Sequence, residues 1–492
     1  MRTIFVTALY LCIIAAQAQH GHSASFLQRI PGVSLLRDLT SSTIDVVNNV
    51  VDGALGLASD ETIIQKASEC LTCKRDPDAT RNVSEIIRSR EFVAEEYQVQ
   101  TKDGYILTIQ RIVNPLINEA LRPKLKPVIL QHGLMSSSVD WVINSVQVRP
   151  APFPAQSKVQ NENGRQNSLE TDAEHNQEEI SSLGDDQDHP NSLGFYLANR
   201  GYDVFLGNSR GNIYGQKHIK LSTWEPKFWD FTFDEQIKFD LPDTIEFVQN
   251  LTGHKKVGYV GHSQGTVMMF GLLSDRPEYA DIVEPFVALA PVAYVSNTVS
   301  PVKYFAVYTP AFEHINWWFA TSNAAIKYLG PIVCGPKVVR RELCANLLFL
   351  TVGFNEQELD DSRVSAYMGH SPSGTSVKNI AHYGQEVLSG RFAHFDHGVL
   401  ANQIKYGQAR APDYDLSKIR SKSIALFIAQ NDWLAAPKDV SRLRASLSVE
   451  PYAVVNMTEL MPKWNHIDFV YGKDAGKLVN TRILKIFEHF NP

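Results

Sequence analysis

Residues Gly261–Gly265 read Gly-His-Ser-Gln-Gly, and they stand between an apolar run at Val257–Val260 and a helix-like stretch at Thr266–Leu273. This order predicts a strand, a sharp turn and a helix, with the hydroxyl of Ser263 projecting above the edge of a sheet. Glycines near the serine avoid side chains that would collide with the adjoining strand and helix. The pentapeptide alone also occurs in ordinary turns, but its flanks favour a nucleophile elbow.

The acid partner of Ser263 is expected downstream of it. A serine hydroxyl is a weak nucleophile unless a base removes its proton, and a carboxylate orients that base. Around an elbow of this kind the chain order is serine, acid, histidine. The acids that compete for the role are Asp432, Asp439, Asp468 and Asp474. Asp432 follows the strand-like run Ser423–Ala429, at the sheet edge where catalytic groups gather. Asp439 lies in a helical pattern and Asp468 stands too near the candidate histidine, so Asp432 is the expected acid.

Two histidines follow Asp432, and they differ in setting. His466 lies in a loop between a strand-like and a helix-like segment, whereas His489 lies within the terminal helical pattern. His466 is therefore the expected base. The earlier histidines have no zinc-type spacing and are expected to be hydrogen-bonded polar residues; they include His314, His382, His394 and His397. No metal site is predicted.

The oxyanion formed by serine attack needs hydrogen-bond donors already aimed at it. The residue after the nucleophile supplies one backbone N–H, here that of Gln264. The second is expected from the loop after the early apolar run Val128–Leu130, and Leu134 is the candidate. His132 and Gly133 then shape that turn. The alternative is that the His-Gly pair only ends a strand.

The ends and the composition predict a secretory protein. An apolar stretch from Ile4 to Ala16 and small residues at Ala16 and Ala18 predict a signal peptide at residues 1–18, too short to span a bilayer. The alternative is a buried first helix. No later apolar run has spanning length, so we expect a secreted protein, with the lysosome as the alternative. The net charge of −6, without a long basic block, argues against nucleic-acid binding.

Glycosylation sequons and cysteines agree with entry into the secretory route. The three N-x-[ST] sites are Asn82, Asn250 and Asn456. Beyond the signal peptide the cysteines number four, an even set that suits an oxidising compartment: Cys70, Cys73, Cys334 and Cys344. Three pairings are possible, and the local pair Cys334–Cys344 is favoured. Zinc or thioredoxin-like chemistry at Cys70 and Cys73 lacks a second ligand pair or a βαβ setting.

The pattern along the chain predicts an α/β fold in several parts. Residues 19–75 form a helical extension, either packed on the body or acting as a pro-segment or lipid-surface anchor. Residues 76–293 alternate strands and helices, interrupted at 145–189 by a polar insertion expected to be disordered. Residues 294–411 are helical and aromatic, which suggests a cap, and the strand rhythm returns in 412–492. At 492 residues the chain can bury a large core and an accessory domain.

Many short segments in one order resemble the acid lipase family, which contains the gastric and lysosomal acid lipases. The resemblance runs from about Asp76 to about Phe487, apart from the polar insertion. The segments that carry it are Asn82–Ile87, Glu96–Tyr97, Asp103–Leu107, Leu130–Leu134, Gly201–Val204, Leu206–Asn212, Phe233–Glu235, Gly261–Thr266, Ala288–Ala293, Gly374–Ser376 and Asn465–Phe469. It implies an α/β-hydrolase fold with a mainly helical cap inserted in the core.

The same resemblance implies roles for individual residues. The family's nucleophile, acid, base and oxyanion donors fall on Ser263, Asp432, His466, Leu134 and Gln264. Its cap disulfide matches Cys334 and Cys344, while its free cysteine corresponds to Val352. The polar insertion and the extension with Cys70 and Cys73 depart from the family pattern, and the insertion could alter access to the site.

The expected function is hydrolysis of neutral lipid esters, triacylglycerol or cholesteryl ester, at a lipid–water interface and without a cofactor. One alternative is a non-catalytic lipid-binding protein on a lipase scaffold; such proteins usually lack a triad member, and here all three positions are filled. The other alternative is an esterase that prefers short or sterol esters.

Overall fold

The computed structural model describes residues 76–152, 189–309, 315, 317–319 and 351–490. All of them belong to one compact unit, Arg75–Pro336 with Arg340–Pro492. The predicted signal peptide, the 19–75 extension and the four cysteines of the predicted mature chain lie outside the described residues. So does most of the predicted insertion.

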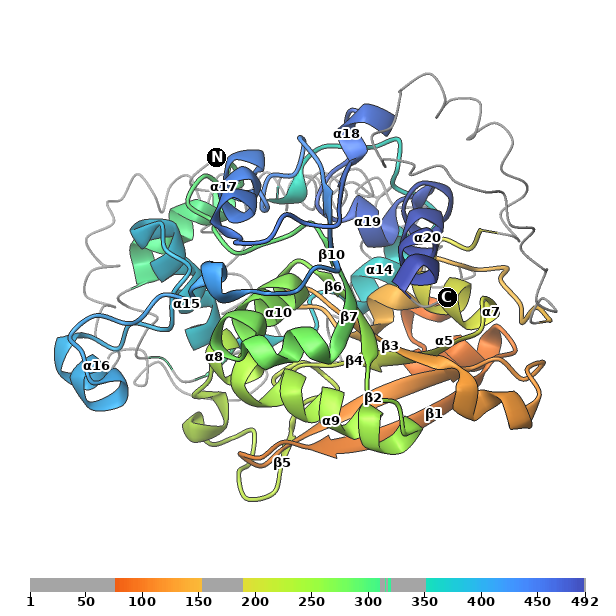
Figure 1. Ribbon diagram of the computed structural model, residues 1–492, viewed down its shortest axis with the longest axis horizontal. Helices are drawn as coiled ribbons and strands as arrows, with labels where there is room; N and C mark the ends of the chain where they lie inside the picture. The colour runs from red at the N-terminus through yellow and green to blue at the C-terminus, as the bar shows by residue number, and fades with distance from the viewer. Residues whose placement is uncertain (1–75, 153–188, 310–314, 316, 320–350, 491–492) are drawn as a thin grey trace, which may run out of the picture. The chain divides into compact units, whose positions relative to one another are not determined.

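The centre of this unit is a mixed, mainly parallel sheet (Figure 1). Its first strands, β1 (Val93–Gln100) and β2 (Tyr105–Val113), form an antiparallel hairpin. The strand order is β1-β2-β4-β3-β6-β7-β10-β11, and β5 pairs with β2. The remaining strands are β3 (Lys126–Gln131), β4 (Tyr202–Gly207), β5 (Lys217–His218), β6 (Val257–His262), β7 (Val283–Leu289), β10 (Ile424–Ile428) and β11 (Ala453–Asn456). From β4 to β11 every neighbouring pair is parallel.

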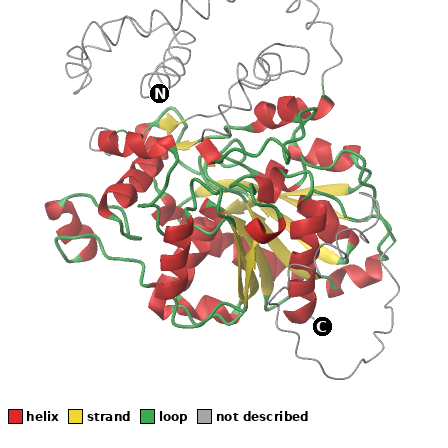
Figure 2. Cartoon of the chain, turned by 90° about the horizontal axis from the view of Figure 1, so that it is seen from above, coloured by secondary structure: helices red, strands yellow, loops and turns green. Residues whose placement is uncertain are grey.

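Helices cover the sheet, as Figure 2 shows from above. Every residue of β4 and β6 is buried, which explains why their sequences read as continuous apolar runs rather than alternating ones. The longer helices of this layer are α7 (Leu193–Asn199), α9 (Leu241–Thr252), α10 (Gln264–Asp275), α17 (Pro437–Ser446) and α20 (Thr481–Phe490). Packing is close: a Cβ added at Gly258 of β6 would lie 2.3 Å from a ring carbon of Phe487 in α20.

Shorter helices connect these elements. The α-helical ones are α5 (Val83–Ser89), α8 (Phe233–Glu235), α18 (Met457–Leu460) and α19 (Asp468–Tyr471). The 3-10 turns are η2 (Pro77–Ala79), η3 (Glu119–Lys124), η4 (Ser138–Trp141), η5 (Pro226–Trp229), η7 (Pro277–Asp281) and η9 (Leu416–Lys418). The two π-helical segments are η6 (Gln236–Asp240) and η10 (Gly476–Asn480). The long helix suggested by the pattern at 235–251 is thus interrupted by the π-helical turn η6.

The segment between the two parts of the sheet is mainly helical where the structure describes it. It contains η8 (Pro301–Tyr308), β8 (Trp318–Phe319), α14 (Val364–His370), β9 (Thr375–Ser376), α15 (Val377–Ser389) and α16 (Val399–Tyr406). The short strands β8 and β9 pair with each other, apart from the main sheet. The longer described elements of 294–411 are thus helices, and residues 310–314, 316 and 320–350 lie outside the described residues.

The predicted start of the disordered insertion is wrong. Residues 145–152 are described, and Ser145 and Val148 are buried. The backbone carbonyl of Ser145 accepts a hydrogen bond from Arg90 Nε at 2.9 Å, and its hydroxyl accepts one from the N–H of Ser192 at 2.8 Å. The polar composition did not predict the burial of Ser145, because its hydrogen-bond partners lie far away in the sequence.

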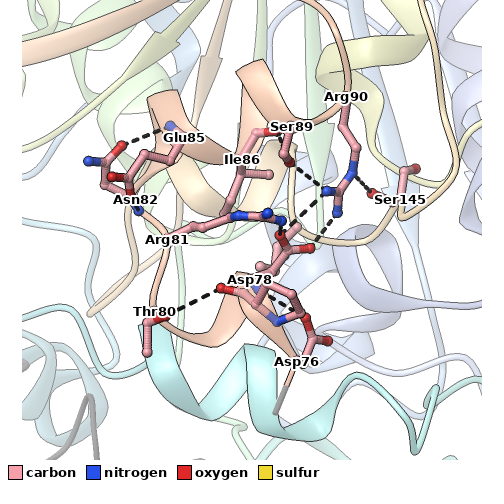
Figure 3. Close-up of polar contacts among 12 residues, drawn as sticks. Asp76, Asp78, Thr80, Arg81, Asn82, Glu85, Ile86, Ser89, Arg90 and Ser145 are labelled. Carbon is pink, nitrogen blue, oxygen red and sulfur yellow. Dashed lines mark hydrogen bonds and ion pairs between the residues drawn. The ribbon is translucent and has the colours of Figure 1, made fainter. Parts of the chain in front are cut away.

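An ion cluster surrounds the buried Asp78, and Figure 3 shows Arg81 and Arg90 pointing toward its carboxylate. Arg363, the residue before α14, also belongs to the cluster. The Asp78 carboxylate accepts from the guanidinium of Arg90, from Arg81 at 3.0 Å and from Arg363 at 2.9 Å. Burial alone raises the pKa of Asp78, but these cations hold it below its ordinary value. Removing Asp78 would therefore leave the buried Arg90 without an ionic partner in the described part of the chain.

Replacing Asp78 by alanine is expected to destabilise the protein by about 3–5 kcal/mol, because Arg90 would stay buried without its counter-charge, while Arg363 would keep only its pair with Asp76. Chemical denaturation followed by tryptophan fluorescence measures this loss. The control is Asp413→Ala, which removes the 2.7 Å pair of Asp413 with Arg391. Asp413 is 58% exposed, so its loss should cost less than about 1 kcal/mol. Similar losses in both variants would contradict the prediction.

Candidate active site

The nucleophile elbow predicted from the sequence is present at the end of β6. Ser263 has φ 52° and ψ −114°, outside the regions that non-glycine residues normally occupy, and α10 begins at the next residue. A Cβ on Gly261 would lie 2.7 Å from the backbone carbon of Gly265, and one on Gly265 would lie 2.5 Å from the carbonyl oxygen of Gln131. Neither position has room for a side chain, which explains the spacing of the glycines.

Ser263, His466 and Asp432 lie together in one hydrogen-bonded chain. His466 Nε2 is 2.8 Å from Ser263 Oγ, and His466 Nδ1 is 2.9 Å from each carboxylate oxygen of Asp432. Asp432 Oδ1 also accepts the backbone N–H groups of Leu434 at 2.9 Å and Ala435 at 2.8 Å. The carboxylate is therefore held from two sides, and it places the imidazole proton on Nδ1. This leaves Nε2 able to accept the proton of the serine hydroxyl.

Four of the residues set aside on sequence grounds lie away from Ser263. Asp439 accepts from the backbone and side-chain nitrogens of Asn297, both at 2.7 Å. His489 is exposed and stacks on Tyr452. His382 and His394 lie beside Asp234 rather than Ser263. Within the part of the chain that the structure describes, no group of three or more potential ligands is arranged to hold a metal ion.

The loop that carries Leu134 lies against the elbow. Its strand, β3, pairs with β6, and Gln131 is opposite Gly261. A Cβ on Gly133 would lie 3.2 Å from Ser263 Cβ, a tight contact, so the backbone of this loop runs close to the serine. Gln264 is the first residue of α10, where backbone N–H groups have no partner within the helix. Gln264 thus directly follows Ser263, and Leu134 directly follows the glycine whose backbone lies close to Ser263.

Two side chains that the sequence reasoning did not assign support the site. His262 Nε2 is 2.8 Å from the backbone carbonyl oxygen of His466. Burial lowers the pKa of His262 to about 3, so its ring is neutral and Nε2 donates. The Gln264 side chain donates to Gln236 at 3.0 Å and accepts from Asn379 at 2.9 Å and Tyr383 at 3.1 Å. Their position in the Gly-His-Ser-Gln-Gly turn was the only signal.

Asp468, a rejected candidate acid, is buried two residues after His466 and acts within its loop. Asp468 Oδ2 accepts from the backbone N–H of Asn465 and from Asn355, both at 2.7 Å. Burial raises the pKa of Asp468 to about 8 and that of Glu358 to about 7. Carboxyl groups of the unfolded chain titrate near pH 4. Between these values the folded chain holds protons that the unfolded chain releases, so stability falls as pH rises.

We expect the free energy of unfolding to decrease between pH 7 and pH 9, with Asp468 contributing about 1 kcal/mol of the decrease. His394 acts in the same direction: burial lowers its pKa, but Asp234 and Asp275 outweigh burial and raise it to about 9. Its stabilising charge is therefore lost through that range. Urea denaturation at stepped pH tests this, and Asp468→Asn should flatten the decrease. An unchanged slope in that variant would assign the effect to other groups.

An α/β sheet with a strained serine at the end of a central strand, followed by an acid and a histidine, defines the α/β-hydrolase class. Residues 83–145 match a family model described as a partial alpha/beta-hydrolase lipase region, and residues 186–325 match one described as the alpha/beta hydrolase fold. The α/β-hydrolase fold expected from the sequence is thereby confirmed.

Relatives identify the family. The chain is 36% identical to lysosomal acid lipase/cholesteryl ester hydrolase of Homo sapiens, over 84% of this chain and 92% of that one. It is 35% identical to gastric triacylglycerol lipase of Rattus norvegicus and to lipase member K of Homo sapiens, with the same coverage. The protein belongs to the acid lipase family, as its motifs suggested, and it is a carboxylic ester hydrolase of the lipase type.

Proposed function

We propose that the protein hydrolyses neutral lipid esters, triacylglycerol or cholesteryl ester, through an acyl-enzyme on Ser263. The observation that carries the proposal is the 2.8 Å contact of Ser263 Oγ with His466 Nε2, whose ring is held by Asp432. The names of the relatives, a cholesteryl ester hydrolase and a triacylglycerol lipase, support these two substrate classes.

In the proposed reaction, Ser263 Oγ attacks the ester carbonyl carbon while its proton moves to His466 Nε2. The backbone N–H groups of Leu134 and Gln264 stabilise the oxyanion. His466 then protonates the departing alcohol, leaving an acyl group on Ser263. A water molecule, deprotonated by His466, attacks that acyl group, and the fatty acid leaves as the serine regains its proton. Asp432 stabilises the imidazolium at both stages.

The test is an assay of the purified protein on emulsified triacylglycerol and on cholesteryl ester across a range of pH, with inactivation by a serine-directed phosphonate as the control. A series of acyl chain lengths separates a lipase from an esterase that prefers short or sterol esters. Lipid binding without any ester hydrolysis would support the alternative of a non-catalytic lipid-binding protein and contradict the proposal.

The segment 294–411 is proposed to act as a cap over this site. Asn379 and Tyr383, both on α15, hydrogen-bond to the side chain of Gln264, the neighbour of Ser263. These contacts support a cap that is attached to the elbow itself. The proposed disulfide within the cap, Cys334–Cys344, lies outside the described residues.

The lipid–water interface is proposed to contact α16, the helix at the left edge of Figure 1. Val399, Leu400 and Ile404 on this helix are 65%, 83% and 88% exposed, an unusual concentration of apolar surface. Water-insoluble substrates require an enzyme to bind such an interface, and exposed apolar side chains on a helix are suited to it.

The double variant Leu400→Glu, Ile404→Glu is therefore expected to hydrolyse emulsified triolein at least about tenfold more slowly, because two charges replace apolar contacts with lipid. Its activity on a soluble short-chain ester should be unchanged. Leu251→Glu, which alters a 40% exposed leucine at the end of α9, is the matched control. Equal loss on both substrates would argue against a role at the interface.

We also propose that the protein enters the secretory route, with secretion or the lysosome as its destination, since the named relatives are lysosomal or gastric. Asn82 and Asn250 are exposed, as glycan attachment requires. Asn82 caps α5 through its oxygen, which leaves its nitrogen for a glycan. Asn456 is half-buried, and its side-chain nitrogen donates to Glu459 at 2.8 Å. Glycosidase treatment followed by mass spectrometry of each sequon tests the three sites.

Among the described residues, no helix has the length and apolarity of a membrane span.

A further inference from the structure

The neighbours of His132, a residue in the loop after β3, determine which of its two ring nitrogens carries the proton. The backbone N–H of Ser209 is 3.2 Å from His132 Nε2, and a backbone N–H can only donate. The side-chain nitrogen of Asn212 is 3.0 Å from the same atom, and Asn212 is oriented by accepting the N–H of Tyr214 on its oxygen. His132 Nε2 therefore accepts. Because burial lowers the pKa of His132 to about 4, the ring is neutral and its one proton is on Nδ1.

That proton is donated to the next peptide unit. His132 Nδ1 is 2.7 Å from the carbonyl oxygen of Gly133, and the N–H of Ser136 reaches the same oxygen at 3.3 Å. Among the described residues, cis peptide bonds occur only before Pro285 and Pro372, so the Gly133–Leu134 peptide is trans. In a trans peptide the C=O and the following N–H point in opposite directions. Holding the Gly133 carbonyl toward His132 therefore turns the Leu134 N–H away from it.

The Gly133–Leu134 peptide begins at a residue that lies close to the nucleophile. A Cβ on Gly133 would lie 3.2 Å from both Ser263 Cβ and His262 Nδ1. A rotation of this peptide would redirect the Leu134 N–H without displacing the strand before it. The contacts of His132 oppose that rotation, since Ser209 and Asn212 anchor its ring to the loop after β4.

We propose that His132 is a positioning residue for the oxyanion hole: its Nδ1–H holds the Gly133 carbonyl so that the Leu134 N–H stays aimed at the oxyanion. The proposal rests on the proposed acyl-enzyme mechanism at Ser263. It predicts that His132 affects stabilisation of the tetrahedral intermediate more than binding of the ester.

The test compares His132→Leu, which removes the donor, with His132→Asn, whose amide nitrogen can replace Nδ1. Both are assayed on p-nitrophenyl butyrate, with butaneboronic acid as a tetrahedral analogue of the intermediate. His132→Leu is expected to lower kcat by about 10- to 100-fold, less than loss of a donor itself, because Ser136 still holds the carbonyl. KM should change little, affinity for the boronic acid should fall in parallel with kcat, and His132→Asn should recover much of the loss.

His370→Leu is the matched control, because His370 is equally buried and its Nε2 contacts the carbonyl oxygen of Asp78 at 2.7 Å. It should lower stability without changing kcat. Wild-type kcat in folded His132→Leu, or a loss confined to KM, would overturn the proposal. If the leucine variant does not fold, His132→Asn alone carries the test. Equal fold-losses of kcat and of boronic acid affinity in this variant would support the proposal, and unequal losses would overturn it. Failure of the proposed function is distinguished separately, since Ser263→Ala would then retain activity.

Discussion

Ser263→Ala is expected to lower kcat for ester hydrolysis by about 10⁶-fold, because the acyl-enzyme cannot form and only binding and oxyanion stabilisation remain. The fold should survive, since the hydrogen bond that Ser263 Oγ loses is the one with His466 Nε2, and the backbone bonds of the elbow do not involve the side chain of Ser263. Covalent labelling by a phosphonate should disappear with the activity.

The matched control for this variant is Ser274→Ala. Ser274 is a buried serine on α10, the helix that follows the elbow, and its hydroxyl has no hydrogen-bond partner among the described residues. Its activity and phosphonate labelling should equal those of the unmodified protein. Hydrolysis by Ser263→Ala above about 1% of the unmodified rate would mean that another group is the nucleophile, since triad removal normally leaves far less.

Asp432→Asn is expected to lower kcat by about 10⁴-fold through the tautomer of His466. Asp432 Oδ1 accepts two backbone N–H groups, those of Leu434 and Ala435, so an asparagine must keep its oxygen at that position. Its NH₂ group then replaces Oδ2, one of the two oxygens that lie 2.9 Å from His466 Nδ1. A proton on Nδ1 would meet this donor, so the imidazole proton is expected to move to Nε2. His466 would then present a donor to Ser263 Oγ instead of the base that the reaction needs.

This loss should appear in kcat, while the substrate KM and the stability change little, because the substitution preserves shape and most hydrogen bonds. Asp439→Asn is the control: Asp439 is also a buried acid in the same region of sequence, but it binds Asn297. Normal activity in Asp432→Asn, or an equal loss in Asp439→Asn, would show that Asp432 does not orient the base.

Much of the fold was predictable because buried parallel strands read as continuous apolar runs. Val257–Val260 and Ser423–Ala429 correspond to β6 and β10 for this reason. The π-helical turn at Gln236–Asp240 and the burial of Ser145 were not predictable. The helical pattern at 235–251 does not reveal the π-helical turn, and the contacts of Ser145 are made with residues far along the chain.

The sequence by itself determined the identity and order of the candidate triad, because Ser263 and Asp432 each follow a strand whose apolar pattern marks its end. It also determined the elbow, since only glycine leaves room beside Ser263. Only the tertiary structure decided the proton positions: the neutral rings of His132 and His262 depend on burial and on donors and acceptors up to 204 residues away. Desolvation and hydrogen bonds between distant residues arise only when the chain is folded, so no local pattern can encode them.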